Sequence, residues 1–594
     1  MSAQFKIKAA DPASVVRLER ELGLPRFIAA TLVARGIDNP AAVHRFLAPS
    51  LERDWLDPYI IPGLSDVADA LEAAVKRGDH ILVFGDFDLD GISATTVLTR
   101  GLRALGAQAT PFIPLRFEEG YALSQAAITR ACSFGPDFIV TVDCGIACKA
   151  EAAAVVEAGL GLAITDHHEP VDLVPEGVPV ADPKCDANCP SSILAGVGVA
   201  LKLVQVLGGR LGQPHLWRDF TDFATLGTVA DLMPMRDENR ALVSDGIARM
   251  NAAPRPCIAA LLATSGAADK PVSATNLSFS VIPRLNAAGR MGDAQLALDL
   301  LMTDDFEEAN RLATKLESVN DQRRAIEAEL SEIAKAQAAE IYHGQRALVV
   351  SGESWHEGVK GIVASRLVNT YGVPSLLFTI DGDEARGSGR SVGQVSLFSA
   401  VESASDLLTR FGGHDAAVGV TLPADKLPEF ERRLCAYMDA LPEGAFHPLV
   451  EIDSCVSLDE LTLDNVAQLD KLAPFGQEHP VPVYLARDVM LANCRAVGAE
   501  KNHFSCSLSD GRATVSGIMF HCSDIESLMR TDSVVNAAFE VQIDEWRGRK
   551  SVKAMLQSLA PARTCGALEA CLNPENLSFV ADLYATSDAE LSRE

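Results

Sequence analysis

Four short motifs place acidic and histidine side chains directly after runs of apolar residues. Carboxylates and neutral imidazoles together make suitable ligands for divalent cations such as Mn2+ and Mg2+. Two such ions side by side hydrolyse phosphate esters, because they activate a water molecule and stabilise the leaving oxygen. The motifs therefore predict a two-metal site that cleaves phosphate esters. They contribute Asp86, Asp88, Asp90, Asp143, Asp166, His167, His168 and Asp231.

The first motif carries carboxylates at alternate positions, Asp86, Asp88 and Asp90, ahead of Gly91. Residues two apart in an extended strand point the same way, so the three carboxylates could converge on one point. Their mutual repulsion makes a bound cation the natural reason to hold them together. For this motif alone, a solvated acidic turn that caps a helix is the alternative.

The other three motifs supply the remaining ligands. Asp143 closes an apolar run and could bridge two metals or cap a helix. One of His167 and His168 could bind metal while the other faces a substrate phosphate, and Asp166 could orient the pair. Asp231 follows the run 226–230 and is the expected last ligand.

Three glycine-containing loops and one basic aromatic segment form a second layer of candidates. Guanidinium groups pair with phosphate through two hydrogen bonds, and rings beside arginine can stack nucleobases. Each segment alone is better explained by a structural turn or a core aromatic, but together they suggest a cleft between two α/β units. The candidates are Arg116, Tyr121, Arg284, Asn286, Arg290, Ser388, Arg390 and His414.

Alternating strands and helices must position these residues. The alternation predicts a doubly wound parallel sheet between about residues 66 and 165. Ligands in such sheets gather beyond the carboxyl ends of the strands, and all the metal motifs are expected there. The predicted strands are 81–84, 109–113, 138–142 and 162–165, and the predicted helices are 67–75, 94–105, 124–131 and 147–158.

The remaining patterns predict further domains. Residues 195–310 are mainly helical, and 306–341 carry apolar residues at helical spacing with no Pro or Gly, which indicates one long helix. A second α/β unit follows, and short strands with polar turns then predict a small barrel. The predicted parts are a helical lead-in, a catalytic α/β domain, a connecting helix, a smaller α/β domain, a barrel and a tail, at residues 1–65, 66–300, 301–341, 342–440, 449–560 and 561–594.

The composition agrees with a multidomain cytoplasmic enzyme. The 594 residues are too many for one core, and 48% apolar with 22% charged residues is typical of globular proteins. No apolar run approaches the ~18 residues of a spanning helix, and the N-terminus lacks a secretory signal. The net charge of −28 argues against a non-specific DNA coat, although a local basic groove can coexist with it. The 13 cysteines are expected to be buried reduced thiols rather than zinc ligands.

Eleven motifs together resemble the DHH phosphoesterase superfamily and, more narrowly, its RecJ family of bacterial single-stranded-DNA-specific exonucleases. The resemblance covers about residues 60–560. It implies a parallel-sheet DHH domain, a long helix, a smaller α/β DHHA1 domain and a C-terminal OB-fold around a hole that admits one strand. The motifs are VFGDFDLDGISAT, IPLRFEEGYALS, TVDCGI, ITDHH, LAGVGVA, LGTVADLMPM, PRLNAAGRMGDA, WHEGVKGIVASRL, FGGHDAAVG, LAPFGQEHP and IDEWRGR.

The resemblance also implies a role for each candidate. Two Mn2+ or Mg2+ ions would be held by six ligands, with Asp88 and Asp90 favoured within the triplet, and His168 would assist. Arg116, Ser388 and Arg390 would grip a terminal 5′-phosphate. Asn286 and Arg290 would hold the scissile region, Tyr121 would exclude duplex, and His414 would belong to the DHHA1 glycine motif. The six ligands are Asp86, Asp88, Asp90, Asp143, His167 and Asp231.

The implied reaction is processive 5′→3′ hydrolysis of single-stranded DNA to 5′-mononucleotides, in DNA recombination and repair. The enzyme is expected to act as a monomer, with single-strand-binding protein and a helicase as partners and no membrane. Two alternatives stay open: a phosphodiesterase for short oligonucleotides or cyclic dinucleotides, which would usually lack the barrel, and an inactive binding scaffold, which would lack ligands. The sequence departs from the family pattern at Glu478, His479, Asp544, Val418 and Lys360.

Overall fold

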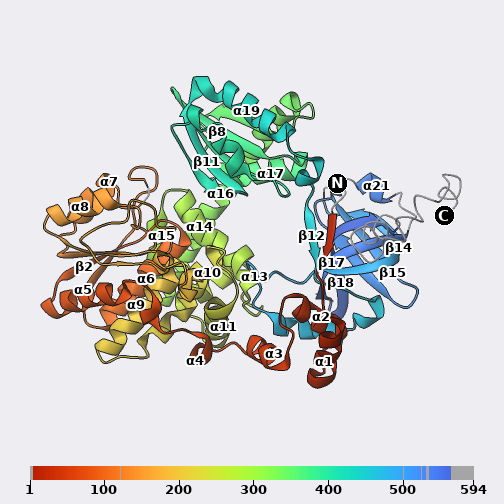
Figure 1. Ribbon diagram of the computed structural model, residues 1–594, viewed down its shortest axis with the longest axis horizontal. Coiled ribbons are helices and arrows are strands. Elements are labelled where there is room, and N and C mark those ends of the chain that lie inside the picture. The colour runs from red at the N-terminus through yellow and green to blue at the C-terminus, as the bar shows by residue number, and fades with distance from the viewer. Residues whose placement is uncertain (1–3, 121, 500, 523–524, 530–533, 563–594) are drawn as a thin grey trace.

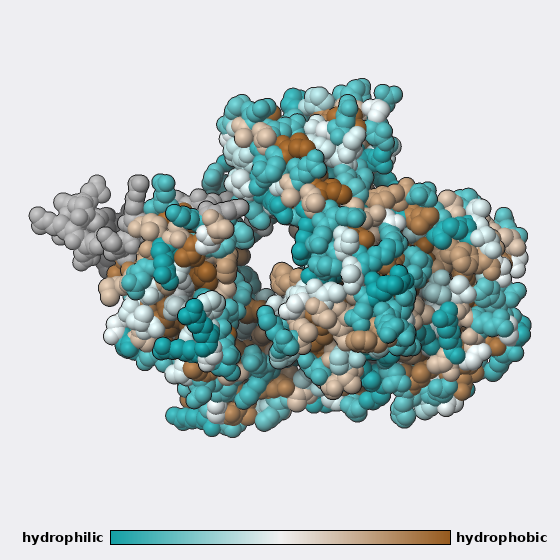
Figure 2. Space-filling model, turned by 180° about the vertical axis from the view of Figure 1, so that it is seen from behind, coloured by the Kyte–Doolittle hydropathy of each residue, from teal (hydrophilic) through white to brown (hydrophobic). Residues whose placement is uncertain are grey.

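The computed structural model describes residues 4–562, apart from residues 121, 500, 523–524 and 530–533. The chain forms two α/β bodies and a β-barrel, seen at the left, top and right of Figure 1. The space-filling view in Figure 2 shows an open passage between them. The hole expected from the resemblance is therefore a feature of the fold.

The first body is built on a five-stranded parallel sheet with the strand order β3-β2-β4-β5-β6. Ile81 and Val83 of β2 face one hydrophobic core, and Leu82 and Phe84 face another. Burial on both faces explains why these strands are continuous apolar runs. The elements are β2 (His80–Phe84), β3 (Gln108–Phe112), β4 (Phe138–Thr141), β5 (Gly161–Thr165), β6 (Val180–Ala181), α5 (Leu64–Arg77), α6 (Leu89–Ala104), α7 (Gln125–Cys132) and α8 (Lys149–Glu157).

A helical layer covers one face of this sheet, while α7 and α8 cover the other. The segment Pro283–Arg290, interpreted from its sequence as a loop, is helical, and that interpretation was wrong. Pro283 fits the first helical turn, where the backbone N–H has no partner in the helix. The helices are α9 (Gly196–Arg210), α10 (Thr221–Ala230), α11 (Asp237–Ala252), α12 (Pro256–Thr264), α13 (Ala274–Asn276), α14 (Ile282–Arg290) and α15 (Ala294–Met302), with the π-helical turn η5 (Leu277–Val281) between α13 and α14.

The predicted long helix is α16 (Phe306–Ile341), whose 36 residues span about 54 Å. The Asp305 carboxylate caps it by accepting a hydrogen bond from the Glu308 amide. Its first half packs on the first body through Leu312 and Leu316, and its second half packs on the second body through Leu330. One helix therefore connects the two α/β bodies.

The second body has a mixed sheet with the order β10-β11-β9-β8-β7. The segments 386–391 and 411–414 were interpreted as turns, but they lie in or overlap strands β9 and β10. Gly387 and Gly389 fit in β9 because a Cβ there would lie 2.4 Å from Phe378 and 2.8 Å from Leu376. The elements are β7 (Leu348–Glu353), β8 (Ser375–Asp381), β9 (Glu384–Arg390), β10 (Arg410–His414), β11 (Ala417–Pro423), α17 (Lys360–Tyr371), α18 (Leu397–Glu402) and α19 (Leu427–Asp439).

The C-terminal sheet closes into a barrel through the additional pairing of β14 with β17. The N-terminal helices pack on the barrel core, and a first strand pairs with β12, so residues 1–65 are more than the helical lead-in that was predicted. The elements are β1 (Gln4–Ile7), α1 (Pro12–Leu22), α2 (Arg26–Ala34), α3 (Pro40–Leu47), α4 (Leu51–Asp54), β12 (Leu449–Ile452), β13 (Ser454–Cys455), α20 (Leu463–Ala467), β14 (Tyr484–Val497), β15 (His503–Ser509), β16 (Thr514–Met519), α21 (Ile525–Met529), β17 (Val534–Trp546) and β18 (Arg549–Pro561).

A buried polar network joins the barrel to the first body. Arg240 of α11 donates hydrogen bonds to the carbonyl oxygens of residues 472–474. His479, which departs from the family pattern, lies 2.9 Å from both Arg35 and the Leu472 carbonyl oxygen, and Arg35 also binds Asp453. Across the described residues, no helix has the length and apolar character needed to cross a membrane.

Candidate metal centre and substrate cleft

The predicted metal ligands converge from five elements of the first body. Asp86 follows β2, Asp143 follows β4 and His167 follows β5, as expected for a parallel sheet. Asp231, however, lies at the C-terminus of helix α10 and not at the end of a strand. The helical layer thus delivers a ligand that the sheet does not.

The acidic triplet converges in a way that strand alternation did not predict. Asp88 is the N-cap of α6, and its carboxylate accepts hydrogen bonds from the Asp90 and Gly91 amides at 2.9 and 3.1 Å. The Asp90 carboxylate accepts from the Gly196 and Val197 amides at 2.7 and 3.0 Å, at the start of α9. The helix cap and the metal site, which the sequence left as alternatives, are therefore both supported by the structure.

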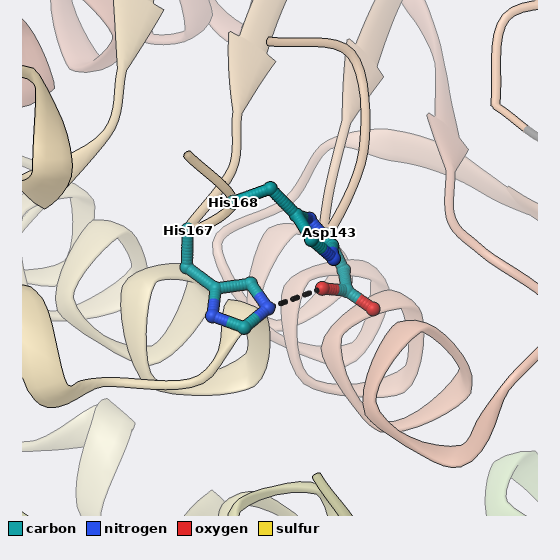
Figure 3. Close-up of side chains that lie close together, drawn as sticks. All are labelled: Asp143, His167 and His168. Carbon is teal, nitrogen blue, oxygen red and sulfur yellow. Dashed lines mark ion pairs between the residues drawn. The ribbon is translucent and has the colours of Figure 1, made fainter. Parts of the chain in front are cut away.

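His167 lies at the centre of the carboxylates. Its Nε2 is 3.0 Å from an Asp143 oxygen, 3.6 Å from an Asp231 oxygen and 3.7 Å from an Asp90 oxygen. Figure 3 shows the His167 ring directed at Asp143, with the His168 ring close by. Three overlapping groups of possible ligands have atoms within 4.8 Å of one another: Asp143, His167 and His168; Asp90, His167 and Asp231; and Asp86, Asp88 and Asp143.

Two glycines of the helical layer make this close packing possible. A Cβ at Gly196 would lie 2.5 Å from an Asp143 oxygen, and one at Gly227 would lie 2.5 Å from an Asp90 oxygen. Any larger residue would therefore displace a ligand carboxylate. Neither glycine was predicted to have a role, although both belong to motifs that carry the family resemblance.

The buried carboxylates destabilise one another in the absence of a cation. Burial, with the Asp88 charge next, raises the pKa of Asp86 to about 8 and that of Asp231 to about 6. Burial and the neighbouring carboxylates hold the pKa values of Asp90 and Asp143 well above their usual range. One Asp86 oxygen is buried without a hydrogen-bond donor among the described residues. This donor set fits divalent cations, which would replace the missing donors and offset the repulsion.

The pKa values of the two histidines are shifted in opposite directions. Burial lowers the pKa of His167 to about 3, so its imidazole is neutral, as a metal ligand must be. Although burial opposes it, the Asp166 carboxylate raises the pKa of His168 to about 9 through a 2.7 Å hydrogen bond to Nδ1. Asp166 also accepts from the Ile146 amide at 2.9 Å, which fixes it in place. The structure therefore places one neutral imidazole in the cluster and one imidazolium at its edge.

A cavity of about 290 Å³ opens beside the carboxylates. Three of the predicted substrate-site side chains line it together with the candidate metal ligands Asp88, Asp90 and Asp231. They are Arg116, Asn286 and Arg290.

Comparison with known proteins agrees with this arrangement. Three family models match the chain: the DHH family N-terminal domain at residues 80–228, the DHHA1 domain at 344–440 and the RecJ OB domain at 452–558. The RecJ exonuclease of Bacillus subtilis is 33% identical over 94% of this chain and 71% of its own length, and that of Escherichia coli is 30% identical over 94% and 100%. The chain belongs to the RecJ family of single-stranded-DNA-specific exonucleases. The crystal structure of Thermus thermophilus RecJ in complex with Mn2+ matches with a TM-score of 0.80, at 30% identity over 94% of this chain and 79% of the other.

These matches confirm the predicted fold class, the DHH, DHHA1 and OB architecture of the RecJ family. Crystal structures of Thermus thermophilus RecJ hold Mn2+ in one case and Mg2+ in another, the two ions that the sequence predicts. The residue assignments rest on the geometry of this chain.

The second body brings Ser388 and Arg390 toward the first. Both lie on β9, with Arg390 Nη1 3.4 Å from the Ser388 hydroxyl, and both approach Gly361 near the start of α17, where a Cβ would lie 2.6 Å from Arg390. Arg290 of α14 donates to the Gly358 carbonyl oxygen at 3.2 Å, and the positive charge of Arg390 contributes to lowering its pKa, after burial. Arg290 of the first body therefore contacts the second body and lies within electrostatic range of Arg390.

Two predicted substrate residues, Arg284 and His414, do not line this cavity. Arg284 is buried and bound to Glu317 and the Ser280 carbonyl oxygen, so the structure does not bring it to the cleft. His414 lies on β10, two strands from Arg390, and is exposed. Tyr121 lies outside the described residues. Lys360, another departure from the family pattern, is buried and binds Glu357 and the Arg386 carbonyl oxygen.

An aromatic pair lies beside Arg116, and the pairing of its two rings was not predicted. Phe117 follows Arg116 and is 49% exposed, and its ring packs edge-on against His356 with centroids 5.8 Å apart. The Arg116 guanidinium lies 4.7 Å from the centre of the Phe87 ring. A half-exposed ring beside an arginine is suited to stacking a nucleobase. The basic aromatic segment was noted from the sequence, but its partner His356 lies far along the chain.

Proposed function

We propose that this protein is a metal-dependent exonuclease that degrades single-stranded DNA from the 5′ end and releases 5′-mononucleotides. The observation that carries the proposal is the convergence of five carboxylates, three of them buried, and a neutral histidine beside a cavity that Arg116 and Arg290 line. The open passage between the three bodies (Figure 2) is consistent with a threaded single strand. The names of the relatives support the same activity.

Six residues would hold two Mn2+ or Mg2+ ions in this proposal. When bound, such ions lower the pKa of a water molecule and stabilise charge on the leaving oxygen. Asp88 and Asp90 are the favoured members of the triplet, although Asp86 also retains an unpaired buried oxygen. The six are Asp86, Asp88, Asp90, Asp143, His167 and Asp231.

The other side chains would bind and orient the strand. Asp166 keeps His168 protonated, so that its imidazolium can pair with a phosphate oxygen and carry a proton at Nε2. Asn286 and Arg290 would hold the scissile phosphate in the cavity. Arg116, which lines the same cavity, would contact the terminal 5′-phosphate. Ser388 and Arg390 on β9 would bind the terminal 5′-phosphate, which sets the direction of degradation.

The wider setting is also part of the proposal. The enzyme would act in the cytoplasm. It would act as a monomer, because one chain by itself surrounds the passage. It would need a helicase to supply single strands, and single-strand-binding protein is a second expected partner. Its role would be in DNA recombination and repair.

A labelled-strand experiment tests the activity. A 60-mer carrying a 3′ label and a 5′-phosphate is incubated with enzyme and Mn2+, alongside the same strand in duplex and a trinucleotide. The proposal predicts progressive shortening of the single strand from its 5′ end, release of mononucleotides and resistance of the duplex. Cleavage confined to the trinucleotide would favour the oligonucleotide phosphodiesterase, and binding without cleavage would favour the inactive scaffold.

A further inference from the structure

A second cavity, of about 640 Å³, lies in the first body away from the metal centre. Its size is within the usual range for small-ligand sites, which is about 300–1,000 Å³. Four arginines from three helical segments line it, and Phe220, Leu216 and Met302 provide an apolar surface. The arginines are Arg100, Arg103, Arg249 and Arg255.

Arg103 has no carboxylate within ion-pair distance among the described residues. Its Nε donates to the Ala109 carbonyl oxygen at 2.9 Å, which leaves its terminal nitrogens available. Burial first, and then the positive charge of Arg100, lower its pKa. A bound anion would offset the repulsion between the Arg100 and Arg103 charges.

The other three arginines each lie near a carboxylate, and the three ion pairs differ in strength. Arg255 pairs with the buried Asp222 at 2.7 Å. Arg100 pairs with Asp304 at 3.0 Å, and Arg249 lies 3.7 Å from Asp219, but these two carboxylates are 69% and 63% exposed. Exposed pairs contribute little, because solvent competes for both partners. The cavity therefore keeps an excess of positive charge in a chain whose net charge is −28.

Two helices connect this cavity to the metal centre. Helix α6 carries Asp90 in its first turn and Arg103 in its last turn, about 20 Å apart along the axis. Helix α10 begins beside the cavity with Asp222 and ends at Asp231, about 14 Å away. The two helices pack against each other in the layer beside the sheet (Figure 1). The cavity is thus separate from the metal centre but connected to it by rigid elements.

We propose that this cavity is a second anion site that binds a small phosphate ester of nucleotide size. The phosphate would contact Arg103 and Arg249, and the apolar surface around Phe220 would accept the ring of the ligand. The inference concerns residues that the proposed exonuclease reaction does not use, so either idea can fail without the other.

Equilibrium binding of dAMP to the full-length protein in EDTA tests this site, because chelation removes the metals that would attract phosphate to the catalytic centre. We expect one dAMP to bind per chain, with competition by inorganic phosphate and much weaker binding of deoxyadenosine. The double variant Arg103→Glu/Arg249→Glu should bind dAMP at least about tenfold more weakly. The matched control Arg77→Glu/Arg432→Glu, which reverses two exposed arginines elsewhere, should bind as the wild type does.

A second variant locates the binding. Asp143→Asn alters the metal centre but not the cavity, so it should leave dAMP affinity in EDTA unchanged. Loss of binding in Asp143→Asn, or equal binding by the double variant and its control, would overturn the proposal. Equal affinity for dAMP and inorganic phosphate would also overturn it, since the ring would then have no site. Circular dichroism of each variant shows whether a loss reflects unfolding.

Discussion

The metal centre of the first body and strand β9 of the second present charged groups in opposite ways. At the metal centre, Asp90, Asp143 and His167 are almost fully buried, and the pKa values of both carboxyls are raised. On β9, Ser388 and Arg390 are only partly buried and bind neighbouring groups of their own body. The first arrangement is unfavourable until cations enter, whereas the second is stable on its own.

This difference suggests a division of work between the two bodies. Repelling carboxylates held by glycine contacts and helix N-termini cost stability, which is typical of sites built for metal ions and chemistry. An arginine and a hydroxyl on a strand suit recognition of a phosphate without requiring a change in the protein. Substitutions in the first body should therefore abolish turnover, while those in the second should weaken binding of the DNA end.

The largest expected effect comes from Asp143→Asn. Removing the central carboxylate should lower the rate of single-strand hydrolysis by at least about 1,000-fold, because metal binding and water activation are both lost. In EDTA the thermal unfolding midpoint of the variant should equal or exceed that of the wild type, since a buried charge has been removed. Mn2+ should raise the midpoint of the wild type more than that of the variant, as measured by calorimetry.

Asp439→Asn, an exposed carboxylate on α19, is the matched control and should retain full activity. If Asp143→Asn kept normal hydrolysis, the metal assignment and the contrast between the two bodies would both be wrong.

His479 sharpens the comparison because it is as buried as His167 but has the guanidinium of Arg35 as its nearest charged neighbour. Burial, and then Arg35, lower its pKa to about 4 in the folded protein, against 6.5 when unfolded. The folded state thus binds fewer protons between these values, so stability is full above pH 6.5 and falls as the pH drops toward 4. Acidification from pH 7 to 5 should cost about 2 kcal/mol through this residue.

Calorimetry at the two pH values measures this loss. His479→Asn should reduce the fall in thermal midpoint on acidification, whereas His521→Asn, at an exposed position, should not. An identical fall in wild type and His479→Asn would show that this network does not sense acid.

Arg390→Ala tests the second body directly. We expect about tenfold weaker binding of a 5′-phosphorylated strand, since one guanidinium–phosphate contact is lost. The rate of hydrolysis at saturating substrate should change little. KM and kcat for 5′-phosphorylated and 5′-hydroxyl strands measure the effect, with Arg432→Ala as the exposed control. An unchanged preference for the phosphorylated end would show that the phosphate site does not lie on β9.

The smallest effect is expected in the barrel, which lies outside both regions. Trp546 is 72% exposed beside Arg549, and a ring there could stack one base of a long strand. Trp546→Ala should weaken binding of a 60-mer by about fivefold and leave trinucleotides unaffected, while Trp546→Phe should keep most of the affinity. Fluorescence anisotropy measures both, and a larger effect than that of Arg390→Ala would show that the barrel contributes more to DNA binding than β9 does.

Local patterns predicted much of the fold and the acidic and histidine residues that converge in the first body. The central strands were predictable because they are apolar on both faces, and α16 because its apolar residues keep helical spacing over 36 residues without Pro or Gly. The acidic and histidine motifs were recognisable because few other functions require such clusters after apolar runs. Strand β9 was missed because glycine is rare in strands, and its glycines are explained only by contacts with Phe378 and Leu376.

The sequence by itself determined the four acidic or histidine motifs, the long helix and the family to which the chain belongs. The tertiary structure decided which of them meet. It brought Asp231 from a helix end to the ligands at the strand ends, directed Arg284 into an ion pair with Glu317, and placed Phe117 against His356. Such encounters depend on packing between residues far apart in the chain, and local propensity carries no information about them.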